Sequence, residues 1–174
     1  LDQAKTAIKR EGFAIVVEGN MDVIASFSAG VENIVAVSGT ALTPEQVDML
    51  KRYTSNIKLC FDMDEAGQKA VSGSVQTCLE KEADVEVVLL PEGCKDAGDL
   101  TLKDPGAWKK SIEKASPVME YFFSAITKKY DRNNPKGKRL IASECVNIVK
   151  HIGDPIEQSY WSKKLSDDIQ VEED

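Results

Sequence analysis

Two short acidic motifs contain the residues of this chain best suited to chemistry. The first, Glu18-Gly19-Asn20-Met21-Asp22, follows the apolar run from Phe13 to Val17, and the second, Asp62-Met63-Asp64, follows the run from Ile57 to Phe61. In an α/β fold, the carboxyl ends of the strands meet at one edge of the sheet, where ligands bind. Carboxylates crowded there repel each other unless a cation joins them. The two motifs therefore predict a Mg²⁺ or Mn²⁺ site and, with it, phosphate chemistry.

The spacing within each motif suits this role. Gly19 permits a tight turn after the strand, and Asp22 then falls in the first turn of a helix, where the helix N-terminus stabilises a carboxylate. Asp62 and Asp64 are two residues apart, so an extended backbone points both side chains the same way. Two ions held there would stabilise the attacking and leaving oxygens of phosphoryl transfer together. Taken singly, each motif is common in helix caps and loops, and the prediction rests on finding both at strand ends.

Two further segments are expected at the same edge. Asp96 and Asp99 leave the fourth apolar run, and either metal support or ordinary solvation in a loop would explain them. The segment Ser38-Gly39-Thr40 follows the second run and could present amides or hydroxyls to a phosphate. A simple turn before a helix that starts at Thr43 explains it almost as well. His151, near a helix end, is interpreted as a cap and not as a catalytic group.

The elements that must position these residues follow from hydrophobic patterning. Four nearly continuous apolar runs are typical of strands buried on both faces of a parallel sheet. They are Phe13–Val17, Asn33–Val37, Ile57–Phe61 and Val85–Leu90. Helical spacing between and before them predicts helices at Asp2–Arg10, Met21–Ala29, Thr43–Tyr53 and Asp64–Lys81. The order predicts an α/β fold with a four-stranded, doubly wound parallel sheet flanked by helices.

The character of the sequence changes after Pro91. A loop is expected over residues 92–100, and no strand pattern follows it. Helices are predicted over residues 105–114, 116–130, 136–151 and 154–169, with a loop rich in Asn, Pro and Gly at 131–137. We therefore expect two domains, an α/β metal-binding domain at 1–100 and an all-α helical bundle at 101–174.

Composition narrows the function classes. The formal net charge of −7 argues against an overall electrostatic grip on nucleic acid. No apolar run has the length of a membrane span, and no signal peptide is recognised at the start. The four cysteines are scattered and only one histidine is present, so no zinc site is expected. We expect the cysteines to be reduced thiols in the cytoplasm. Because the sequence does not begin with Met, we interpret it as part of a longer protein.

The motifs and their flanks resemble a known family. Glu18-Gly19-x-x-Asp22 followed by Asp62-x-Asp64 is similar to the Toprim pattern of primases, topoisomerases and certain nucleases. The similarity is greatest to bacterial replicative DNA primases. It extends through Leu1-Asp2-Gln3-Ala4-Lys5, Ser38 to Thr43, Phe61 to Gly67, Leu90 to Gly93 and the helical tail. Two departures stand out: Asn20 where primases commonly have Tyr, and Asp96-Ala97-Gly98-Asp99 where Asp-Pro-Asp is common, which displaces the second acid by one position.

The resemblance implies a metal-assisted nucleotidyltransferase that makes short RNA primers. Glu18, Asp22, Asp62, Asp64 and Asp96 would hold Mg²⁺ or Mn²⁺ and position a nucleoside triphosphate, with Glu18, Asp62 and Asp64 as the catalytic residues and Glu18 as general acid/base. Gly19, Ser38, Gly39, Thr40 and Asp99 are candidates for support of the metal or nucleotide.

The family also implies partners and further domains. The expected partners are a single-stranded DNA template and the replicative helicase, in the cytoplasm and near the nucleoid of a bacterium. A zinc-binding domain, a basic part of the polymerase core and a C-terminal helicase-binding domain are expected outside these residues. The chain alone should therefore make little or no primer.

Two alternatives remain open from the sequence. A Toprim-type nuclease would use the same acids with water as the nucleophile. A non-enzymatic α/β interaction module would use the acids as helix caps. A topoisomerase fits less well, because its second motif usually runs Asp-x-Asp-x-Glu-Gly and here Ala66 precedes Gly67.

Overall fold

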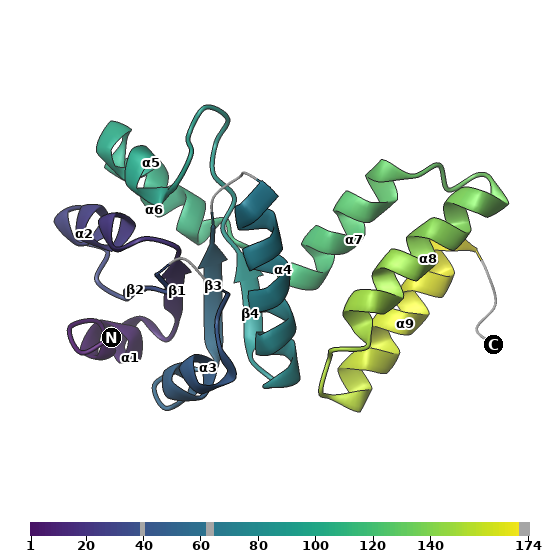
Figure 1. The fold of residues 1–174 in the computed structure, drawn as a ribbon, viewed down its shortest axis with the longest axis horizontal. Helices are drawn as coiled ribbons and strands as arrows, with labels where there is room; N and C mark the ends of the chain where they lie inside the picture. Colours follow the sequence, from purple (N-terminus) through teal and green to yellow (C-terminus); the bar gives the residue numbers. More distant parts are fainter. Residues whose placement is uncertain (39–40, 62–64, 171–174) are drawn as a thin grey trace. The chain divides into compact units, whose positions relative to one another are not determined.

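A computed structural model gives the fold of the chain (Figure 1). It describes residues 1–38, 41–61 and 65–170, and for residues 65–72 the backbone alone. The chain forms two compact units, Leu1–Pro117 and Val118–Asp174. The first unit extends past residue 100, where we expected the α/β part to end.

The first unit is built on a sheet of five strands in the order β2-β1-β3-β4-β5. Four strands are parallel: β1 (Ala14–Val17), β2 (Ile34–Ala36), β3 (Asn56–Cys60) and β4 (Asp84–Val87). Val17 lies opposite Ala36 on one side and Cys60 on the other, so the first three strands end at the same level. This alignment puts the carboxyl ends of these three strands at one edge of the sheet, as expected for parallel strands.

The fifth strand corrects the expectation of four. β5 (Ser116–Pro117) pairs antiparallel with β4, with Ser116 opposite Val87. The sequence placed these residues at the start of a helix and predicted no strand beyond the fourth. Two residues cannot carry an alternating or apolar pattern, so the pairing with β4 is a tertiary effect that local sequence does not encode.

Helices cover both faces of the sheet. The chain moves one way from β1 to β2 and the other way from β2 to β3 and β4. Right-handed crossovers therefore place α2 (Asn20–Ser28) on one face and α3 (Pro44–Lys51) and α4 (Glu65–Glu80) on the other. α1 (Lys5–Glu11) precedes β1, and Lys9 Nζ lies over the Tyr53 ring just beyond α3.

Two short helices complete the face covered by α2. They are α5 (Ala97–Lys103) and α6 (Pro105–Glu113), and α5 packs against both α2 and α6. Ile15 and Val17 of β1 meet the fully buried Trp108 of α6 in one apolar core. The sequence placed a loop up to residue 100 and missed α5, because a helix of seven residues is too short to show periodic apolar spacing.

Helix caps were predicted well where side chains form them. Thr43 caps α3 by accepting a hydrogen bond from the Gln46 N–H, and the Gln46 side chain accepts one from the Thr43 N–H, with Pro44 at the first helical position. The start signal read from the sequence is therefore confirmed.

The second unit consists of three helices, α7 (Val118–Lys129), α8 (Pro135–Val149) and α9 (Pro155–Ile169). Asn134 and Asp154 cap the last two, each followed by Pro. Phe123 of α7 and Trp161 of α9 meet with ring centroids 5.2 Å apart in the core of this unit. Within the described part of the chain, no helix combines the length and the apolar character needed to cross a membrane.

Candidate metal and nucleotide site

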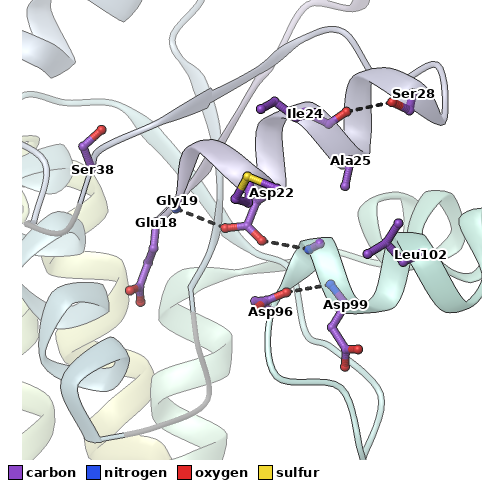
Figure 2. Close-up of a pocket in the computed structure, with 12 residues that line it drawn as sticks. Glu18, Gly19, Asp22, Ile24, Ala25, Ser28, Ser38, Asp96, Asp99 and Leu102 are labelled. Atoms are coloured by element: carbon purple, nitrogen blue, oxygen red, sulfur yellow. Dashed lines mark hydrogen bonds between the residues drawn. The ribbon is translucent and has the colours of Figure 1, made fainter.

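The first acidic motif lies where β1 gives way to α2. Gly19 is the residue before the helix, and its N–H donates to Asp22 Oδ2 over 3.0 Å. Figure 2 shows Glu18 extending from the end of β1, away from the Asp22 carboxylate. The turn thus separates the two acids: Glu18 is half-buried at the mouth of a pocket, whereas Asp22 turns inward.

The loop after β4 brings Asp96 to the same pocket. Asp96 caps α5, and its Oδ1 accepts a hydrogen bond from the Asp99 N–H over 2.6 Å (Figure 2). The start of the short α5 therefore holds Asp96 in a defined position, which the sequence could only assign to a loop.

Asp22 connects these two segments. Its side chain is buried, with the residue 7% exposed, and its Oδ1 accepts a hydrogen bond from the Gly98 N–H over 2.8 Å. Both carboxylate oxygens are thus bound to backbone amides, one in the β1–α2 turn and one in the first turn of α5. The contact joins parts of the chain that are 76 residues apart in sequence.

The electrostatics of the pocket are those of crowded acids. Burial raises the pKa of Asp22 above its ordinary value, the Gly98 and Gly19 amides oppose that rise, and the nearby Asp96 carboxylate adds to it. A cation placed among these groups would relieve the repulsion, and carboxylate oxygens are the ligands that Mg²⁺ and Mn²⁺ prefer. The donor set therefore fits a hard divalent ion.

The pocket has a volume of about 730 Å³ and two different walls. Four acids among the described residues line the pocket and form its acidic wall: Glu18, Asp22, Asp96 and Asp99. Met21 and Ile24 of α2 and Leu102 of α5 lie along the other, and these three residues are strongly exposed. This apolar wall was not predicted from the sequence; the recurrence of apolar residues on the outer side of α2 was the available signal.

Asp99 is engaged within α5. Its Oδ2 lies 2.7 Å from Lys103 Nζ, one helical turn away, and accepts a hydrogen bond from the Lys95 N–H over 3.3 Å. The Lys103 ammonium holds the pKa of Asp99 below its ordinary value. Figure 2 shows the Asp99 carboxylate directed away from Asp22.

The remaining predicted residues are placed only in part. The Ser38 N–H donates to the Glu18 carbonyl over 2.9 Å, so this amide is not presented to a phosphate, although Ser38 still lines the pocket. Gly39, Thr40, Asp62 and Asp64 lie outside the described residues. Within the ranges that are described, no three His, Cys, Asp or Glu side chains are grouped as metal ligands.

Two protein-family models match the chain. A Toprim-like model matches residues 15–101, and a model described as the DnaB-helicase binding domain of primase matches residues 119–174. The second match differs from our expectation that the helicase-binding domain lies outside these residues.

Curated relatives of the chain are DNA primases. That of Clostridium acetobutylicum is 32% identical over 162 residues, covering 91% of this chain and 26% of the relative. That of Listeria innocua is 32% identical over 173 residues, covering 97% of this chain and 27% of the relative. The chain therefore spans about a quarter of the length of these relatives.

Solved structures give the same picture. A DNA primase domain from Pseudomonas aeruginosa superposes with a TM-score of 0.85 at 30% identity, over 98% of this chain and 54% of that one. A DnaG primase catalytic domain bound to single-stranded DNA gives a TM-score of 0.79 at 26% identity, over 92% and 51%. Both units of the chain thus have counterparts inside solved primase domains.

Proposed function

This chain belongs to the Toprim-like family, and we propose that it is part of the catalytic core of a DNA primase, which makes short RNA primers on a single-stranded DNA template. One observation carries the proposal. The similarity to DNA primases runs through both units and covers 91% to 98% of the chain, far beyond the Toprim-like segment. A nuclease that shared only the Toprim unit would not be expected to match the helical unit as well.

The proposed chemistry is nucleotidyl transfer at the acidic wall of the pocket. Glu18, Asp62, Asp64 and Asp96 would hold the divalent ion, whose chemistry is to neutralise the phosphates and activate the attacking oxygen. Glu18 would accept the proton of the primer 3′-hydroxyl as that oxygen attacks the α-phosphate of a nucleoside triphosphate, and pyrophosphate would leave. Gly19 and Ser38 are proposed to shape the nucleotide end of the pocket. Asp22 was also predicted as a ligand, and its contacts support a different role.

Calorimetric titration with Mn²⁺ tests the site directly. We expect the wild-type chain to bind Mn²⁺, and the Asp62→Asn, Asp64→Asn double variant to lose at least about tenfold in affinity, because two carboxylate ligands lose their charge. Glu113→Gln is the matched control, since this exposed acid on α6 lies away from the pocket. Equal Mn²⁺ binding by the double variant and the wild type would refute the site.

Activity distinguishes primase from nuclease. A longer protein that contains this chain should join ribonucleotides into short RNA primers on single-stranded DNA. The Asp62→Asn substitution should abolish primer synthesis. The chain by itself is expected to synthesise little or no primer. Cleavage of the template without any synthesis would favour the nuclease instead.

The replicative helicase is the second proposed partner, and the family match at residues 119–174 supports it. Residues 119–174 also lie within the chain length covered by primase catalytic-domain structures, so the same helices are proposed to serve the core. Co-sedimentation of the chain with a purified replicative helicase, with and without residues 118–174, tests this contact. We propose that these partners are met in the bacterial cytoplasm.

A further inference from the structure

The Asp22 side chain is buried, and backbone amides donate hydrogen bonds to both of its carboxylate oxygens. The donors are the Gly19 N–H at 3.0 Å and the Gly98 N–H at 2.8 Å. A carboxylate that bridges two backbone amides in a buried place is a strong tie, because hydrogen bonds to a charged acceptor are among the stronger ones in proteins.

The two bonded amides lie next to the two other metal candidates that the structure describes. Gly19 follows Glu18 directly, at the end of β1. Gly98 lies two residues after Asp96, in the first turn of α5. The Asp22 carboxylate therefore fixes the segment that carries Glu18 and the segment that carries Asp96 against one common point.

Gly98 is the counterpart that this tie requires. A Cβ atom at position 98 would lie 3.0 Å from Asp22 Oδ1, 3.3 Å from Asp96 Oδ1 and 3.6 Å from the Asp22 Cα. Such contacts are tight, and two of the three atoms belong to the carboxylates themselves. The absence of a side chain at 98 is what lets the Asp22 carboxylate reach the α5 amide.

This contact is made where the loop departs from Asp-Pro-Asp, since glycine stands at 98 in place of the second acid of that pattern. With glycine at 98, the next acid is Asp99, which pairs with Lys103 at 2.7 Å within α5. In this chain, the Asp22 carboxylate of α2 is therefore bound to the start of α5, and the displaced acid, Asp99, pairs with Lys103.

We propose that Asp22 is a positioning residue of the site, which ties the start of α5 to the β1–α2 turn through Gly98 and so sets Asp96 beside Glu18, and that it is not itself a metal ligand. The inference rests on the proposed function for the identity of the metal site, but the tie itself consists of hydrogen bonds within the chain. Its tests therefore begin with the metal-free protein.

The first test is thermal unfolding of the metal-free 174-residue chain. Asp22→Asn keeps the size of the side chain, but its NH₂ group cannot accept a hydrogen bond, so one of the two amides loses its partner. A tie predicts a fall in Tm of about 5 °C. A residue present only to bind metal predicts an unchanged or higher Tm, because a buried charge beside Asp96 is removed, and that result would overturn the proposal.

The second test compares Asp22→Asn, Gly98→Ala and the double variant. If Asp22 acts through Gly98, the two substitutions break the same contact, so the double variant should lose no more Tm and no more Mn²⁺ affinity than the worse single variant. If Asp22 is a ligand, Asp22→Asn should cost at least about tenfold in Mn²⁺ affinity on its own, and the fold-losses should multiply. Multiplying losses would overturn the inference.

Gly106→Ala is the matched control for the glycine change. Gly106 stands in the first turn of α6, and a Cβ there would lie 3.2 Å from Oδ1 of Asp104, the capping residue of that helix. The geometry resembles that at Gly98 but lies outside the pocket, so Mn²⁺ affinity should match the wild type.

Hydrogen exchange separates this inference from the function it builds on. The Gly98 amide should exchange slowly in the metal-free wild type and at least about tenfold faster in Asp22→Asn. If the wild type binds no Mn²⁺ yet shows this difference, the proposed function fails and the tie stands. If the Gly98 amide exchanges at the same rate in the wild type and in Asp22→Asn, the proposed tie is refuted, whether or not the chain binds Mn²⁺.

Discussion

At the scale of single residues, burial separates the four cysteines. Cys60, Cys78 and Cys145 are buried, whereas Cys94 is only partly covered. Burial raises the pKa of Cys78 to about 12 and, with nearby acids, raises the pKa of Cys145 to about 12 as well. We expect one thiol of the native chain to react quickly with a thiol reagent at pH ~8, and all four to react after unfolding. A fast-reacting thiol that persists in Cys94→Ser would contradict this.

Asp99 is the residue for which the structure most changes the expectation. Asp99→Asn should change Mn²⁺ affinity by less than about twofold, because the carboxylate is paired with Lys103 and is directed away from Asp22. The loss of stability should be small, because solvent screens an exposed ion pair. Titration of the Asp99→Asn and Asp96→Asn variants with Mn²⁺ checks this. Similar losses of Mn²⁺ affinity in the two variants would place Asp99 among the ligands.

The sequence located the acids but not their bonds. Asp22 and Asp96 were expected at one sheet edge because parallel strands bring their ends together, and the structure brings Asp96 close enough to raise the pKa of Asp22. The bond from Gly98 to Asp22 was not foreseen, because it depends on a short helix at Ala97–Lys103 that was read as a loop. Lys103, four residues after Asp99, was the local signal for that helix.

At the scale of elements, the start of α8 depends on a glycine. Asn134 caps the helix by accepting from the Gly137 N–H over 2.7 Å, and a Cβ at 137 would lie 1.8 Å from the Asp131 carbonyl oxygen. Gly137→Ala should therefore lower the free energy of unfolding by about 2 kcal/mol, because backbone must move. Urea unfolding followed by circular dichroism measures this, with the exposed Lys136→Ala as control. Equal stability of the two variants would show that the loop yields without cost.

The contact between Glu144 of α8 and the end of α7 should respond to pH. The Tyr130 hydroxyl and Lys129 both donate to Glu144, and they hold its pKa below the ordinary value of 4.5. A carboxylate with a lowered folded pKa stabilises the protein above the unfolded pKa, and this contribution is lost as pH falls through the folded pKa. Tm measured from pH ~6 down to ~3 should fall less steeply in Glu144→Gln. Parallel curves would refute the assignment.

Elements with side-chain caps and apolar runs were predictable, and those made by tertiary pairing were not. The four parallel strands and the capped helices α3, α8 and α9 lie within a few residues of their expected positions. The strand at Ser116–Pro117 forms by pairing with the outer side of β4, and two residues are too few to predict it from the sequence. The apolar wall of the pocket also required knowledge of which helices meet, here α2 and α5.

At the scale of the whole molecule, the negative net charge of the chain and the acidic pocket act in the same direction on a nucleic acid. The formal net charge is −7, and the pocket adds a local concentration of carboxylates at the place proposed for the nucleotide phosphates. An acidic surface repels the nucleic-acid backbone, and only a bound cation reverses the sign locally. Binding of the template should therefore depend on binding of the metal ion.

We expect this chain alone to bind single-stranded DNA weakly, with Kd above about 100 µM at ~0.15 M salt, which is the weak end of non-specific binding. The physical reason is that few phosphates can be neutralised by a surface with this balance of charge. Fluorescence anisotropy with a labelled oligonucleotide measures the Kd, first with EDTA and then with Mn²⁺. Addition of Mn²⁺ should tighten binding in the wild type and not in the Asp62→Asn, Asp64→Asn variant, because the ion has lost its ligands. Submicromolar binding in EDTA would mean that these residues grip the template without metal, and the acidic pocket would then have to be read as a site for something other than phosphate.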